Sequence, residues 1–134
     1  MMRNKLLRTL LGIVLGGLGG VSLCISVLPT VLQMTGAGDQ MALSYHLAPY
    51  IVHTALIWAA GGWAVTRSGS PLAGGLTMAV VGLVTGMLLV VLGLDAEAKL
   101  LAGGACGGVV YGFLGGLILG RITEAPAPEG EDTP

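Results

Sequence analysis

Apolar residues in this chain gather into four long stretches separated by short polar segments. The stretches contain no Lys, Arg, Asp or Glu and cover residues 9–33, 47–66, 72–94 and 100–120. Each is long enough for a helix to cross a hydrocarbon layer about 30 Å thick, which takes about 20 residues. The stretches do not alternate in polarity as membrane β-strands do. The pattern therefore predicts an all-α, polytopic membrane protein whose residues 1–122 form a four-transmembrane-helix bundle.

Basic residues indicate the orientation of this bundle. Those that would lie on one side of the membrane are Arg3, Lys5, Arg8, Arg67 and Arg121. Only Lys99 falls on the other side, so the positive-inside rule predicts that both termini are cytoplasmic, in a bacterial-type inner (cytoplasmic) membrane. The basic start also resembles the beginning of a signal peptide. Because the apolar run continues to Leu32, longer than a signal peptide needs, we expect an uncleaved first helix.

The connections between the stretches differ in length. Residues 67–71 and 95–99 are short polar turns, which predict that the last three helices are sequential antiparallel neighbours. Residues 34–46 contain several turn-forming residues and are expected to be a loop, after which Pro49 begins the second helix. Residues 123–134 are acidic and Pro-rich, with almost no large apolar side chains. We expect them to form a disordered cytoplasmic tail.

Composition narrows the class of protein further. The chain is 54% hydrophobic and 10% charged, far below the roughly 25% charged residues of soluble domains. Its net charge of −1 gives no basic surface for nucleic acid. The sequence shows no nucleophile with a base, no phosphate-binding loop and no CxxC motif, so we predict no catalytic residues, no cofactor and no enzyme activity.

Glycines in the last apolar stretch follow a helical pattern. All eight fall on two adjacent rows of residues spaced four apart: Gly104, Gly108, Gly112, Gly116 and Gly120 in one, and Gly103, Gly107 and Gly115 in the other. Residues four apart share one face of a helix. In a bilayer, small residues let helix backbones approach closely, and this approach stabilises helix pairs. The first row therefore predicts a tight helix–helix contact.

Other stretches offer small residues that match this row. They are Gly12, Gly16 and Gly20 in the first stretch, Ala55, Ala59 and Gly62 in the second, and Gly82 and Gly86 in the third. The simplest interpretation packs the Gly104–Gly120 row against the Gly12–Gly20 row of the same chain. The alternative is that the Gly104–Gly120 row meets its copy in a second protomer.

Few side chains within the stretches could carry chemistry. His53 and Tyr111 are the candidate polar or proton-handling residues, although an interfacial imidazole and a packed tyrosine are the simpler interpretations. Cys24, His53, Met87 and Cys106 lie at similar depth, one in each stretch, and are the ligand types of a soft metal such as Cu(I). Because Cys106 points away from the Gly104 row, we expect no metal site.

These observations predict a small non-enzymatic integral membrane protein that acts through close helix packing. We expect it to be an accessory, assembly or structural subunit whose partners are the lipid bilayer and other membrane proteins. The alternative is a small homo-oligomeric channel or transporter for protons or a soft metal. Its pathway would use His53, Thr54, Thr85 and Tyr111.

Overall fold

A computed structural model describes residues 2–34, 36, 39–94 and 97–124, and every regular element in these ranges is helical. In chain order the elements are α1 (Met2–Ser22), the π-helical turn η1 (Leu23–Val27), α2 (Leu28–Met34), α3 (Gln40–Leu47), the 3-10 turn η2 (Ala48–Tyr50), α4 (Ile51–Arg67), α5 (Pro71–Gly93) and α6 (Ala98–Ile122). Most of the predicted tail, residues 125–134, lies outside the described residues.

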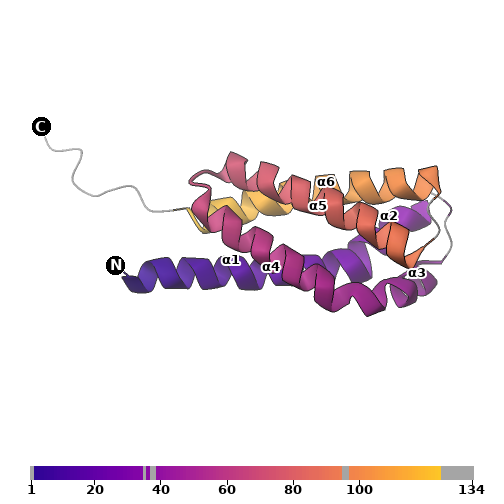
Figure 1. Cartoon of the computed structure of the whole chain (residues 1–134). Helices are drawn as coiled ribbons and strands as arrows, with labels where there is room; N and C mark the ends of the chain where they lie inside the picture. The colour runs from indigo at the N-terminus through magenta and orange to yellow at the C-terminus, as the bar shows by residue number, and fades with distance from the viewer. Residues whose placement is uncertain (1, 35, 37–38, 95–96, 125–134) are drawn as a thin grey trace, which may run out of the picture.

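The long helices lie along a common bundle axis (Figure 1). α1 begins at the end of the bundle where α4 and α6 finish, so Arg8, Arg67 and Arg121 lie there together. We call this the basic end, and we call the opposite end, which holds α2 and α3, the distal end. The basic residues that the sequence places on one side of the bundle therefore lie at one end of it.

The first helix changes its hydrogen bonding near the distal end. α1, η1 and α2 follow one another without a break from Met2 to Met34, so the helix begins earlier than the apolar stretch at 9–33. Pro29 has no N–H to donate to the Ile25 carbonyl four residues before it. Just before it the backbone takes a wider π turn, in which the Leu28 N–H bonds the Leu23 carbonyl. α2 then lies beside α6, with Val31 against Gly107.

The segment expected to be a loop at 34–46 contains a helix, which corrects that prediction. Asp39 has the extended backbone of an N-cap residue, and α3 follows it. Leu43 and Leu47, four residues apart, are buried and fix one face of α3 against the bundle. The Ser44 hydroxyl donates to the Ile25 carbonyl at 2.9 Å. A side chain of α3 thus supplies a hydrogen-bond donor to the carbonyl for which Pro29 has no N–H.

The described chain contains three helices that are long and apolar enough to cross a membrane, rather than the four expected. They are Asn4–Met34, Pro71–Gly93 and Ala98–Ile122. The expected span at 47–66 becomes a regular α-helix only at Ile51, because η2 with Pro49 precedes it. α4 therefore has 17 residues, or about 25 Å at 1.5 Å per residue, which is shorter than a hydrocarbon layer of about 30 Å.

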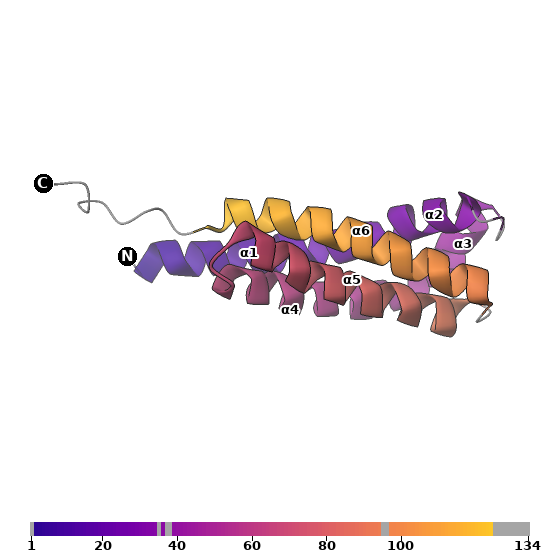
Figure 2. The ribbon, with the colours of Figure 1, turned by 90° about the horizontal axis from the view of Figure 1, so that it is seen from above.

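The bundle consists of two closely packed helix pairs. α1 packs along α4, and α5 packs along α6, while contacts between the two pairs are fewer (Figure 2). The buried core between the pairs holds large side chains, notably Trp58 and Met78. Further residues of this core at the distal end are Leu23, Cys24, Leu28, Leu32, Leu43, Leu47, Leu89 and Val90. Small residues thus hold each pair together, and large residues join the pairs.

Candidate functional site

The Gly104–Gly120 row of α6 packs against α5 within the same chain. A Cβ atom added at Gly108 would strike the carbonyl of Gly82, and one added at Gly82 would strike that of Gly108. Gly104 meets Gly86 in the same way, Gly112 meets the Met78 carbonyl, Gly116 meets Gly74, and Gly120 meets Pro71. From Gly104 to Gly116 the positions on α6 increase by four while their partners on α5 decrease by four, which is the register of two antiparallel helices whose backbones touch.

The expected contact between the Gly104–Gly120 row and the Gly12–Gly20 row is wrong. Gly12, Gly16 and Gly20 pack against α4 instead, where added Cβ atoms would strike the carbonyls of Gly62, Trp58 and Thr54. Gly17, which follows Gly16 in α1, faces Ala55 and Ala59. The small residues of 55–62 are therefore the partners of the first helix. The short connection between α5 and α6 already favours pairing of those two helices, which leaves α1 for α4.

Trp58 occupies the space between the two helix pairs. Its side chain is 2% exposed, and its indole N–H donates to the Thr85 hydroxyl of α5 at 3.0 Å. The Thr85 hydroxyl in turn donates to the Val81 carbonyl at 2.7 Å. On another side the indole packs on the Tyr111 ring of α6, with 5.5 Å between ring centroids and 37° between ring planes. Trp58 thus contacts both helices of the other pair. In the sequence, Trp58 lies in the middle of an apolar stretch rather than at its end, where interfacial aromatics are expected, and this favours a contact within protein.

Three of the four expected pathway residues share one cleft. His53, Thr54 and Thr85 line a cleft of about 290 Å³ between α4 and α5 near the distal end. The Tyr50 hydroxyl, from the turn η2 that leads into α4, donates to the Leu92 carbonyl of α5 at 2.9 Å. The His53 side chain is exposed at the bundle surface. Tyr111 does not line this cleft and lies against Trp58 instead.

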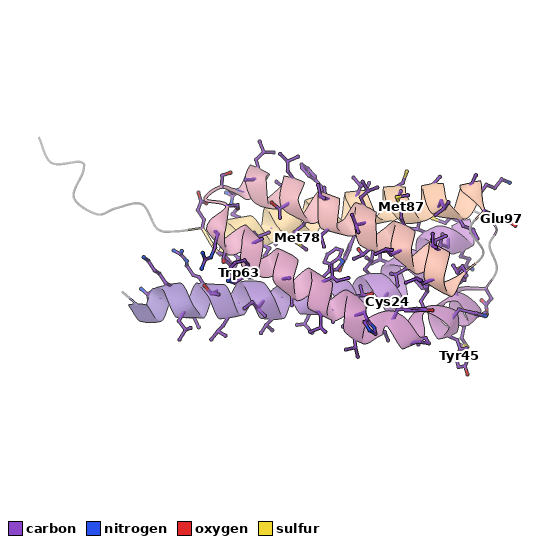
Figure 3. The ribbon with its side chains drawn as sticks, viewed as in Figure 1. Cys24, Tyr45, Trp63, Met78, Met87 and Glu97 are labelled. Carbon is purple, nitrogen blue, oxygen red and sulfur yellow. The ribbon has the colours of Figure 1, made fainter. Side chains whose placement is uncertain are left out.

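The four candidate soft-metal ligands do not converge. Cys24 is fully buried, and its thiol donates to the Leu47 carbonyl at 3.1 Å. Cys106 and His53 are exposed, and Met87 points away from the bundle while Cys24 lies within it (Figure 3). Within the part of the chain that the structure describes, no group of three or more His, Cys, Asp or Glu side chains could hold a metal ion. Equal depth in four helices does not bring these side chains to one point.

The Gly103–Gly115 row of α6 faces the other helix pair less evenly. Gly107 lies against Val31 of α2, whereas a Cβ added at Gly115 would meet no atom within 4 Å. Tyr111, which stands between them in this row, reaches Trp58. At Gly115 this face of α6 therefore borders an open groove rather than a packed helix.

Comparison of the chain with protein-family models, curated proteins and solved structures gives no match in any of the three, so the site rests on its own geometry.

Proposed function

We propose that this chain is a four-span integral membrane protein that serves as an accessory, assembly or structural subunit of a membrane complex. Its site of action is the cytoplasmic membrane, with the basic end on the cytoplasmic side. The three long apolar helices are compatible with a membrane location. The placement of Arg8, Arg67 and Arg121 at one end supports the orientation through the positive-inside rule.

The proposal includes α4 as the fourth span. α4 packs along α1 through the row from Gly12 to Gly20, so a bilayer that holds α1 also surrounds α4. Its outward side chains are largely apolar, including exposed Val52, Leu56 and Ile57. The preceding turn η2 and helix α3 continue the helical path beyond Ile51 and add length at the distal end. A local thinning of the bilayer accommodates a short helix at modest cost.

The observation that carries the proposal is the contrast between the bundle interior and its exterior. Polar contacts inside the bundle involve Trp58, Thr85 and Cys24, so these groups stabilise the fold. The exterior is rich in large exposed apolar side chains on each long helix. Examples are Val14 and Leu18 on α1, Leu56 on α4, Val80, Val84 and Val91 on α5, and Val110, Leu114 and Ile118 on α6. Such a surface suits lipid and partner helices.

A mass measurement tests the subunit role. The tagged full-length chain is extracted from its native membrane in a mild detergent, and the mass of the intact complex is measured. We expect a stoichiometric complex with a larger membrane protein. A homodimer or ring would overturn the subunit role in favour of a channel, and a lone monomer under several mild detergents would overturn both.

Side-specific labelling tests the four-span topology. Single cysteines are introduced at Ser70 and at Glu97, both exposed and at opposite ends of α5, in a Cys24→Ala, Cys106→Ala background. We expect an impermeant maleimide to reach the cysteine at 97 from outside intact cells and the cysteine at 70 only after lysis. Labelling of both from the same side would overturn the topology.

A second candidate function, a homo-oligomeric proton channel or carrier, has one observation in its favour. His53, Thr54 and Thr85 line one cleft, which opens between α4 and α5. A pathway through that cleft would form where two copies meet, because Trp58 fills the centre of the single bundle. Proton flux into vesicles that contain the pure protein tests it. Flux that is lost in His53→Ala would support the channel, and flux equal to that of empty vesicles would overturn it.

A further inference from the structure

An apolar groove lies between α1 and α6 at the basic half of the bundle, where these two helices do not pack closely. Figure 2 shows the course of both helices in that half. Its volume is about 460 Å³, within the range of about 300–1,000 Å³ typical of small-molecule sites. Trp58 and Met78 form part of its lining. The remaining lining residues are Leu15, Gly16 and Gly19 of α1 and Tyr111, Leu114, Gly115, Ile118, Leu119 and Ile122 of α6.

The length of the groove matches one leaflet of a bilayer. On α6 its lining extends from Tyr111 to Ile122, which is about 16 Å at 1.5 Å per residue. Half of a hydrocarbon layer is about 15 Å. The apolar lining and this length suit a single acyl chain that enters from the basic end and reaches Trp58 near mid-membrane.

A polar cleft lies at the basic end of the same groove. It has a volume of about 160 Å³, and Arg8, Arg67, Thr66, Ser70 and Glu124 are among its lining residues. Arg8 precedes Leu15 of the groove by seven residues and so lies on the same face of α1, about 10 Å nearer the basic end. Likewise, Thr123 of the cleft follows Leu119 of the groove by four residues and so lies on the same face of α6. The two lined spaces are therefore neighbours along both helices.

The arginines of this cleft retain donors for an anion. The Arg8 Nε atom is buried and has no hydrogen-bond partner in the described structure. The Arg67 guanidinium lies 4.5 Å from the centre of the Trp63 ring, and stacking of this kind leaves the in-plane N–H groups free to bind. Two guanidinium groups against the single Glu124 carboxylate make the cleft net positive. Phosphate oxygens match the paired N–H groups of arginine.

We propose that this groove and cleft together bind one anionic phospholipid from the leaflet at the basic end. One acyl chain lies in the groove beside Gly115, and the phosphate lies between Arg8 and Arg67. The positive cleft selects an anionic headgroup over a zwitterionic one, as basic pockets between membrane helices do. The site requires only that the bundle lies in a membrane, so it stands independently of the subunit role.

Fluorescence quenching tests the site. The full chain is reconstituted in two sets of vesicles. One contains brominated phosphatidylglycerol, and the other contains brominated phosphatidylcholine at the same mole fraction. Every sample carries Trp63→Phe, so that Trp58 is the single tryptophan and bromine atoms near it quench the measured emission. We expect stronger quenching by the anionic lipid. Arg8→Gln and Arg67→Gln should each weaken apparent binding about fivefold, the factor that corresponds to about 1 kcal/mol per basic residue near a membrane surface.

Three controls sharpen this test. Arg121→Gln removes an exposed charge at the same end that does not line the cleft, and it should retain the preference for the anionic lipid. Gly115→Leu, at a position with open space for a side chain, should fill the groove and reduce quenching in both lipids. Inorganic phosphate at millimolar concentration should not release the lipid, because it lacks the acyl chain.

Several results would overturn the lipid site. These are equal quenching by the two lipids, unchanged binding in Arg67→Gln, unchanged quenching in Gly115→Leu, or release by inorganic phosphate. Arg67 is exposed, so its substitution gives a readout even where Arg8→Gln folds poorly. The quenching readout does not depend on a protein partner, which separates failure of this site from failure of the subunit role.

Discussion

The indole N–H of Trp58 donates to the hydroxyl oxygen of Thr85 at 3.0 Å, and this bond joins the α1/α4 pair to the α5/α6 pair. Both side chains are buried, at 2% exposure each. Each pair also has its own backbone contact through glycines. The bond therefore acts at the less tightly packed boundary of the bundle, where the bond from the Tyr50 hydroxyl to the Leu92 carbonyl is a second polar contact between the pairs.

Thr85→Val should weaken the junction between the pairs. The change keeps the shape of the side chain but leaves the Trp58 N–H without its acceptor, and hydrogen bonds between membrane helices contribute about 0.6 kcal/mol on average and up to about 1.7. We expect a loss of about 1 kcal/mol in the free energy of unfolding, measured by titration from mild detergent into SDS. Thr77→Val is the matched control, because the Thr77 hydroxyl donates to the Ala73 carbonyl of its own helix. Equal losses in the two variants would contradict the assigned role of this bond.

Gly112→Leu should disrupt the α5/α6 pair. A Cβ at this position would strike the Met78 carbonyl, so the two backbones must separate. Overpacking of this kind costs about 1–3 kcal/mol or more, and we expect a lower melting temperature and less monodisperse protein in detergent. Gly115→Leu, one turn away on α6, has open space and should melt near the wild-type temperature. If Gly112→Leu also melts there, the described helix contact is not essential.

Ser44→Ala should loosen the attachment of α3 to the distal end. The Ser44 hydroxyl supplies a donor to the Ile25 carbonyl, which Pro29 cannot reach with an N–H. A hydrogen bond of this kind contributes about 1 kcal/mol, so amide hydrogen exchange in residues 40–47 should accelerate about fivefold. Ser22→Ala, at an exposed position on α1, should leave this exchange unchanged. Equal protection in the two variants would show that the bond does not hold α3.

The two cysteines should react at very different rates. Cys24 is fully buried beneath α3, and Cys106 is exposed on α6. In mild detergent, a membrane-permeant maleimide should label Cys24→Ala protein through Cys106, and it should label Cys106→Ala protein only after denaturation in SDS. Mass spectrometry of the labelled protein measures both rates. Fast labelling of Cys24 in the folded state would contradict its position in the core.

Much of the fold follows from local patterns. Long uncharged stretches predict helices, and the structure has helices at all four, since an apolar environment forces backbone groups to bond within the chain. The row from Gly104 to Gly120 predicts a tight contact because residues four apart share a face. The boundaries were less predictable. Pro29 and Pro49 each accompany a change from the regular α-helical backbone at the distal end. Turn-forming residues predicted a loop before the second stretch, but burial of Leu43 and Leu47 stabilises the helix α3 there.

The candidate site was less predictable than the helices. Depth along four helices suggested that Cys24, His53, Met87 and Cys106 could meet, but the rotation of each helix directs most of them to different sides. His53, Thr54 and Thr85 do share a cleft, because α4 and α5 lie side by side at that end. The lipid groove depends on a gap between α1 and α6, which no single helix pattern can show.

The order of residue types along the chain is enough to predict apolar helices, the helix faces that carry small residues and the grouping of most basic residues at one end. These properties depend on residue type and on a spacing of four along one chain segment. The pairing of these small-residue rows, by contrast, follows from how the folded helices are arranged. Any row of small residues permits close approach to any other such row. Which two rows pack together therefore depends on how the helices align along their length and on which side chains fill the space between the helix pairs. Gly82 meets Gly108, Gly12 meets Gly62, and Trp58 fills the junction between the pairs.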